Sequence, residues 1–515
     1  MTLAPASGTA LQPHPRRWAG LAVLSASLLL VVMDVTVLNV ALPAISADLH
    51  PTAVSLLWMV DVYSLVVAGL LVALSALSDR WGRKKMLIAG FAVFGLASTA
   101  VLWADSPGEV IAVRALLGVG GAMIMPSTLS MIRTLFSDAR ERATALGVWA
   151  AMAAVGGALG PILGGLLLEH FTWHAAFLVN VPVMAAAGIA AIFLLPESRN
   201  PNPGRWDVVA TLLSITGMVA LVYAIKQIGK HGLGDPVALA AVLVAAVTLV
   251  WFVLRCLRRP DPLLEIRLLR SPSFSAGTIA ALTTETAMAG MMLLMAQWMQ
   301  LVQGYSPLET GLRLLPTAVG AFVVSPLAPA LAERIGARTV LAGGLVVSGL
   351  GLLMLFVAPA PLGYPPVAVA LLLVGVGMGS LAIASAVIMA GAPAEKAGSA
   401  AAIEETSYQI GGALGVAVLG TVAGAVYRAD LPVSRLTGEG LSGEATEAVR
   451  ESIGGALDVA KEAGAAGAEL ARQAQAAFSD SLAITGAAGA GLMLLAAVVV
   501  WWITPRDLDL SQGHH

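Results

Sequence analysis

Long apolar segments, separated by short polar stretches, run along almost the whole chain. A membrane-spanning helix needs about 20 mainly apolar residues, and the pattern predicts fourteen helices of this kind. Their expected ranges are 18–42, 55–77, 84–104, 108–131, 141–168, 173–196, 207–228, 236–257, 273–302, 308–332, 338–358, 366–390, 399–427 and 479–503. The sequence therefore predicts an all-α membrane protein.

Lys and Arg are concentrated in every second connection between these segments. The turn between the second and third segments holds four cations: Arg80, Arg83, Lys84 and Lys85. The short connections expected on the other side hold only Lys226 and Lys230. Because cytoplasmic loops are enriched in Lys and Arg, the alternation predicts that both tails, 1–17 and 504–515, are cytoplasmic.

The composition indicates that most of the protein surface contacts lipid. Of the 515 residues, 58% are hydrophobic and 12% are charged, whereas soluble domains are about 25% charged. The net charge of −2 gives no basic field for nucleic acid. The single Cys256 excludes a disulfide framework or a cysteine metal cluster. Neither a phosphate-binding loop nor a nucleophile–base constellation is present, so we expect no enzyme activity, cofactor or metal.

The fourteen segments divide into six, two and six. The predicted units are a first bundle at 18–196, an inserted pair at 207–257 and a second bundle at 273–503. The loop Glu333-Arg334-Ile335-Gly336-Ala337-Arg338 repeats the order of acid, Arg, Gly and Arg found at 79–83. Such an internal repeat is expected where two halves of a transporter share one fold.

One polar region, 428–479, interrupts the second bundle on the expected outer side. It is rich in Ala, Gly, Glu and Ser. Two interpretations remain open: a solvated linker, or a helical hairpin over 443–478 that is broken at Gly464 and Gly467. A hairpin could act as a cap over the outer opening.

The turn after the second segment combines an acid, a base and a glycine. Asp79 ends one predicted helix and Arg83 begins the next, while Gly82 permits a tight turn. Asp79-Arg80-Trp81-Gly82-Arg83-Lys84 resembles the loop signature of the major facilitator superfamily, with Ser75 where the family usually has Gly. The resemblance implies a conformational latch made by these residues: Asp79, Arg80, Gly82 and Arg83.

Several charged residues fall inside the apolar segments. A charge at the centre of a bilayer costs at least about 2.5 kcal/mol, so each of these residues is a functional candidate. They are Asp34, Asp61, Arg114, Glu285, Glu404 and Glu405.

The segment around Asp34 reads Met-Asp-Val-Thr-Val-Leu-Asn-Val-Ala-Leu-Pro over 33–43. It resembles the first-helix signature of drug:proton antiporters of this superfamily. Asp61 follows Trp58 by about one helical turn, and both acids could reach an outward-facing cavity. Asp61 and Trp58 are therefore candidates for substrate binding, and both acids for proton coupling. The alternative for Asp61 is an interfacial residue that reaches water.

Two further motifs strengthen the resemblance. Arg114 begins a stretch that is similar to the family's fourth-helix motif, although Leu117 stands where Gln is usual. Arg114 can stabilise an ionised carboxylate nearby, and family geometry suggests Asp34; a purely structural pair is the alternative. The fifth-helix signature of antiporters is matched by four residues: Gly156, Gly160, Pro161 and Gly164. Small residues and a proline could form a bending seam or simply a packing face.

The second bundle offers a candidate cation site. Glu285 shares its segment with Met288 and Trp298, and Met and Trp suit varied cationic ligands; Met that simply fills the core is the alternative. The segment with Glu404, Glu405 and Tyr408 resembles the corresponding helix of quaternary-ammonium exporters. Adjacent residues of a helix diverge by about 100°, so we expect only one of the two acids to face a cavity.

These resemblances predict a fourteen-helix drug:proton antiporter of the bacterial inner membrane. Its partners would be lipophilic organic cations, protons and the lipid bilayer, and it would act as a monomer. The alternatives are an exporter of one antibiotic or metabolite, an uptake symporter, and a membrane sensor that transports nothing.

Overall fold

The structure is a computed structural model that describes residues 15–200, 206–232, 234–431, 443–464 and 467–506. In these ranges every regular element is helical. Thirteen helices are long and apolar enough to cross a membrane, and the pair α11 and α12, which bends by 55°, makes a fourteenth span if it is counted as one. The predicted all-α membrane fold is therefore confirmed.

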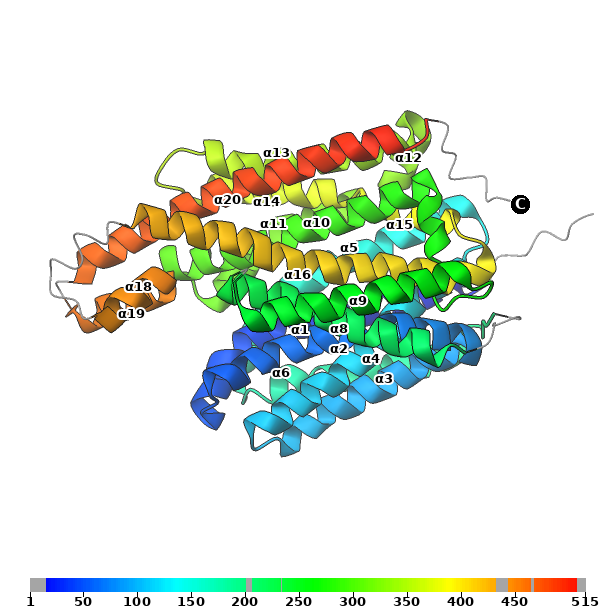
Figure 1. Cartoon of the computed structure of the whole chain (residues 1–515), viewed down its shortest axis with the longest axis horizontal. Coiled ribbons are helices and arrows are strands. Elements are labelled where there is room, and N and C mark those ends of the chain that lie inside the picture. Colours follow the sequence, from blue (N-terminus) through cyan, green and yellow to red (C-terminus); the bar gives the residue numbers. More distant parts are fainter. Residues whose placement is uncertain (1–14, 201–205, 233, 432–442, 465–466, 507–515) are drawn as a thin grey trace, which may run out of the picture.

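Helices of the first bundle follow one another with short connections. They are α1 (Arg17–Leu49), α2 (Ala53–Trp81), α3 (Arg83–Ala100), α4 (Pro107–Leu135), α5 (Ala139–His170), α6 (Ala175–Leu178) and α7 (Asn180–Leu194). The inserted pair is α8 (Val208–His231) and α9 (Pro236–Arg258). Figure 1 shows these helices running side by side along the long axis of the molecule.

Breaks divide several spans of the second bundle. Its helices are α10 (Pro272–Gln297), α11 (Pro307–Val324), α12 (Ala328–Ile335), α13 (Ala337–Val357), α14 (Tyr364–Met378), α15 (Leu381–Ala390), α16 (Ala397–Asp430) and α20 (Gly467–Ile503). Pro326 lies in the bend between α11 and α12, because proline cannot donate the backbone hydrogen bond that would continue the helix. The turn at Gly379 and Ser380 separates α14 from α15.

The region between α16 and α20 is helical where the structure describes it. It contains α18 (Gly443–Glu451) and α19 (Ile453–Glu462), which lie at one end of the molecule in Figure 1. The Tyr427 hydroxyl donates to the Val449 carbonyl at 3.2 Å, and this bond ties α18 to α16. The helical interpretation is thus favoured over a linker. The last helix begins at Gly467, so the predicted start at 479 is wrong.

Two large hydrophobic clusters form the core. One is built mainly from α1 to α7 and the other from α10 to α20. A third, small cluster joins three helices that are distant in sequence: its buried members are Leu65 and Ala68 of α2, Met218 and Val222 of α8, and Ala413 of α16. The inserted helix α8 therefore lies against both bundles, where α2 meets α16.

Candidate functional site

A buried ion pair lies at the centre of the first bundle. Arg114 Nη1 is 2.6 Å from Asp34 Oδ2, and both side chains are only 1% exposed. Asn180 Nδ2 donates to the other carboxylate oxygen at 2.9 Å. Arg114 also donates to the Met59 carbonyl at 3.2 Å and lies 4.7 Å above the Tyr63 ring. The pairing suggested for Asp34 and Arg114 is present, and its polar partners offset part of the cost of burial.

The glycines of α5 hold α1 at close range. A Cβ atom at Gly156 would lie 2.5 Å from the Leu29 carbonyl oxygen, and one at Gly160 would collide with Thr36. Gly164 also faces α1, but a Cβ there would be 3.4 Å from Val40 Cβ, an ordinary van der Waals contact. Because these glycines recur every four residues, they form one face of α5. That face fixes the position of α1 and therefore of Asp34.

Pro161 lies on a different face of α5. A Cβ at Gly311 of α11 would be 3.0 Å from Pro161 Cβ, so α5 contacts the second bundle there. The helix is continuous from Ala139 to His170 through the proline. The glycines thus serve close packing in this structure, and a bend at Pro161 stays a prediction.

Glu404 and Glu405 point to different partners in α16. Glu404 is fully buried, and its Oε1 accepts hydrogen bonds from the Ser385 hydroxyl of α15 and, at 3.2 Å, from the Tyr408 hydroxyl. Its Oε2 has no partner among the described residues. In the described chain, Glu405, which is 4% exposed, accepts a hydrogen bond from Gln409 Nε2 of its own helix at 3.3 Å.

Glu405 lies within electrostatic range of both bundles. It interacts electrostatically with Glu285 of α10 and with Tyr63 of α2 in the other bundle. Glu285 lies against α16, with its Oε1 3.8 Å from where a Cβ of Gly412 would be. In the described part of the chain, neither Glu285, Glu404 nor Glu405 forms an ion pair with Lys or Arg.

Trp298 and Met288 lie deeper in the second bundle. Trp298 is completely buried, and its Nε1 donates to Ser479 Oγ of α20 at 3.2 Å. Met288 belongs to the hydrophobic cluster of this bundle. Their placement favours core packing, which was the alternative for this methionine-rich segment. It does not bring the Trp298 ring to the acids.

Asp61 lies in a separate ion pair with the inserted helix. Lys226 Nζ of α8 is 2.5 Å from Asp61 Oδ1 and also donates to Ser64 Oγ at 3.1 Å. One turn away, the Trp58 ring stacks on Tyr223 of α8 with centroids 6.4 Å apart. The prediction that Lys226 lies in an outer loop is wrong: α8 continues to His231, and the carboxylate neutralises the ammonium group within the helix pair.

The predicted latch residues meet at the junction of α2 and α3. Arg83 donates to Asp79 Oδ1 from two nitrogens, at 3.0 and 2.9 Å. Gly82 has φ +119°, a backbone conformation that favours glycine. Arg80 lies over the Trp206 ring at 5.3 Å. In the repeated loop Gly336 has φ +88°, which matches Gly82 and supports the internal repeat.

Polar contacts join the two bundles on the side of this latch. Ser75 Oγ of α2 donates to the Gly398 carbonyl of α16 at 2.8 Å. Arg133 Nη1 of α4 donates to the Met389 carbonyl of α15 at 2.6 Å. A Cβ at Gly398 would collide with the Asp79 carboxylate. The latch is therefore held against the second bundle, and the bundles meet closely on this side.

The sequence did not point to a site role for Tyr63, Ser385 or Lys226. Lys226 is a charged group within an apolar segment, and that signal could have identified it. Tyr63 and Ser385 carry no such signal, because single hydroxyl groups are common in membrane helices. The Tyr63 hydroxyl is buried and has no hydrogen-bond partner among the described residues.

Buried ionisable residues within a bundle of membrane-spanning helices are typical of transporters. The family model of the Major Facilitator Superfamily matches residues 24–416, and the chain belongs to this family. It is a multi-pass transporter of the bacterial inner membrane, not an enzyme.

Curated relatives match almost the full length of the chain. The multidrug efflux pump LfrA of Mycolicibacterium smegmatis is 42% identical over 94% of this chain and 96% of the relative. The methyl viologen resistance protein SmvA of Salmonella typhimurium is 35% identical over 95% and 98%. The human organic anion transporter MFSD10 has a similar fold, with a TM-score of 0.59 at 14% identity over 94% of this chain and 100% of that structure.

Proposed function

We propose that this protein is a proton-coupled multidrug efflux antiporter for lipophilic organic cations. The single observation that carries the proposal is a group of three acids in the second bundle: Glu404 and Glu405, which are buried, and Glu285, which is partly buried. In the described chain none of these acids has a Lys or Arg partner, so each of the two buried acids must be protonated or must pair with a bound cation. A proton and an organic cation can therefore occupy this place in turn. The relatives named for multidrug efflux and methyl viologen resistance support export and a cationic cargo.

The proposed cycle starts with the side of the latch open. An organic cation enters and pairs with Glu405, which faces the other bundle, and protons leave the acids. The bundles then rock, and the pair of Asp79 and Arg83 fixes the closed side. Protons from outside return to the acids and release the cation. Arg114 keeps Asp34 charged until a proton reaches that carboxylate, so the ion pair can report proton binding to the first bundle.

The test is efflux of ethidium from proteoliposomes under an imposed pH gradient. We expect the gradient to drive transport by the wild-type protein and Glu405→Gln to abolish the coupling. Transport that continues unchanged when the gradient is dissipated would contradict a proton-coupled antiporter. The substitution Lys461→Met on the exposed helix α19 is a matched control, because it alters a charge far from the acids.

A second candidate function is export of one specific antibiotic. Relatives are named for single compounds, including the puromycin resistance protein pur8 of Streptomyces alboniger, which is 35% identical over 81% of this chain. Competition decides between the two functions. A multidrug exporter predicts that ethidium, methyl viologen and an alkyl ammonium compound inhibit one another. A specific exporter predicts saturable transport of one compound that the others do not inhibit.

A further inference from the structure

The pair of Asp61 and Lys226 is more accessible than the buried pair of Asp34 and Arg114. The two side chains are 20% and 22% exposed, whereas Asp34 and Arg114 are almost fully buried. Asp61 lies one turn inside the predicted outer end of α2, since the apolar span there begins at Trp58. Its carboxylate can therefore be reached from the outer part of the membrane.

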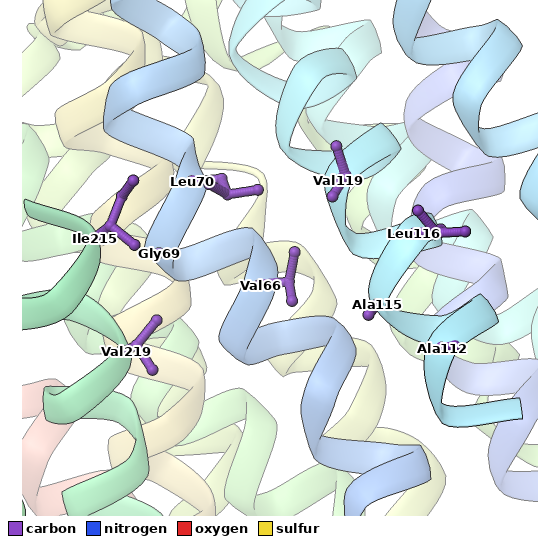
Figure 2. Close-up of a pocket in the computed structure, with 9 residues that line it drawn as sticks. All are labelled: Val66, Gly69, Leu70, Ala112, Ala115, Leu116, Val119, Ile215 and Val219. Atoms are coloured by element: carbon purple, nitrogen blue, oxygen red, sulfur yellow. The ribbon is translucent and has the colours of Figure 1, made fainter. Parts of the chain in front are cut away.

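An apolar groove lies on the same two helices, α2 and α8, closer to the centre of the membrane span. Its volume is about 560 Å³. Figure 2 shows that α2 forms its floor, while α4 and α8 form its two walls. Val66 of α2 is five residues from Asp61, and Val219 of α8 is seven residues from Lys226. At 1.5 Å per residue, the ion pair lies about 8–11 Å from the groove along the helices.

We propose that Asp61 and this groove form a lateral binding site for amphiphilic organic cations, in which Lys226 is a tethered occupant. The cationic head pairs with Asp61, and its alkyl chain lies in the groove. Lys226 Nζ, at 2.5 Å from Asp61 Oδ1, already takes the place of such a head group. A substrate must displace this ammonium group, and its return promotes release of the cargo.

Neighbouring residues fit a cationic head group. Trp58, about one turn before Asp61 on α2, stacks on Tyr223 of α8, and aromatic faces attract organic cations. Ser64 accepts a hydrogen bond from Lys226, so the ammonium group keeps one partner when a substrate takes its place. The groove carries no charge that would oppose an alkyl chain, because its nine lining residues are Gly, Ala, Val, Leu and Ile.

This inference rests on the proposed export of organic cations but can fail independently. The experiment measures equilibrium binding of a compact cation, tetraphenylphosphonium, and a long-chain cation, dodecyltrimethylammonium, to the protein in lipid nanodiscs. Lys226→Met removes the competing charge and keeps the apolar stem. We expect both cations to bind about fivefold more tightly, which is the size of a partly exposed ion pair. In the double variant with Asp61→Asn the gain should disappear.

If the ion pair of Asp61 and Lys226 is only structural, no gain in cation affinity is expected. Loss of Lys226 would then weaken binding or leave it unaltered, and either result overturns the tethered-occupant role. If Lys226→Met does not fold, Lys226→Gln gives the same test with a side chain that can still bond to Ser64. Lys461→Met on α19 is the control for removal of one positive charge, and it should leave both affinities unchanged.

A separate experiment tests whether the groove holds the alkyl chain. Ala112 lines it and is exposed, so Ala112→Phe fills the groove without disturbing the core. We expect weaker binding of dodecyltrimethylammonium and unchanged binding of tetraphenylphosphonium. Ala186→Phe, at an exposed site on α7, is the matched control. Equal binding of the long-chain cation by both variants would show that the groove holds only lipid. If the wild-type protein binds neither cation, the proposed function itself fails.

Discussion

The two bundles bury acidic residues in different ways. In the first, Asp34 is paired with Arg114 and accepts a hydrogen bond from Asn180. In the second, Glu404 and Glu405 are equally buried, but in the described chain they accept hydrogen bonds from hydroxyl and amide groups. An ionised acid without a counterion is very costly to bury. The first bundle therefore holds an acid that is neutralised by its own counterion, whereas in our proposal the acids of the second bundle exchange a proton for a cation.

The largest effect is expected in the charge pair. Asp34→Asn leaves the Arg114 guanidinium buried without its counterion, which costs about 3 kcal/mol or more of folding free energy. Unfolding in a denaturing detergent should show this loss, together with loss of transport. The double variant with Arg114→Met should recover much of the stability but not the transport. Unchanged stability in Asp34→Asn would show that Arg114 needs no counterion.

Substitution of an acid in the second bundle should act on transport and spare the fold. Glu405→Gln is close in shape to a protonated Glu405, so we expect a stability change within about 1 kcal/mol. Binding of an organic cation should weaken at least about tenfold, because its buried counterion is lost. Glu404→Gln should weaken binding less, since Glu404 faces Ser385 and not the other bundle. The reverse order of the two effects would assign the cation to Glu404.

The glycine face of α5 allows a test of how firmly Asp34 must be held. Gly160→Ala forces apart α5 and α1 at Thr36, with a cost of about 1–3 kcal/mol for overpacking, and should slow turnover. Gly157→Ala is the control, because its Cβ would meet no atom within 4 Å. Thermal unfolding and initial efflux rates measure the two effects. Equal rates for the two variants would remove any role for the α1–α5 contact.

A smaller effect is expected where the bundles meet beside the latch. Ser75→Ala removes the hydrogen bond to the Gly398 carbonyl, which is worth about 1 kcal/mol. The population open on that side should rise about fivefold. Spin labels on α4 and α15, in a background with Cys256→Ser, measure the distance distribution. Ser27→Ala is the control, because that hydroxyl donates within its own helix; equal distributions would exclude Ser75 from closure.

Much of the fold could be predicted because lipid imposes simple rules on sequence. The length of the apolar segments and the placement of Lys and Arg predict the spans. The family motifs in the first bundle pointed to Asp34, Arg114 and the latch. Partners were harder to predict. Whether Glu404 or Glu405 faces the other bundle depends on the rotation of α16, and the contact of Asp61 with Lys226 depends on where the inserted pair docks. The spacing of apolar residues along the chain predicts neither the rotation of α16 nor the docking position of the inserted pair.

The methionine-rich segment also shows that packing partners are hard to predict from sequence. Met288 and Trp298 suit a cation site by chemistry, yet they are buried in the core of the second bundle. Residue type indicates what a side chain can bind, whereas the helix face decides what it meets.

The most direct measurement is proton release when an organic cation binds. Tetraphenylphosphonium is added to the purified protein in weakly buffered detergent solution, and the pH is followed together with binding. Exchange at the second bundle predicts that the wild-type protein releases protons in proportion to bound cation, and that Glu405→Gln releases fewer while Lys461→Met releases as many as the wild type. Saturable cation binding without any proton release would contradict exchange at these acids.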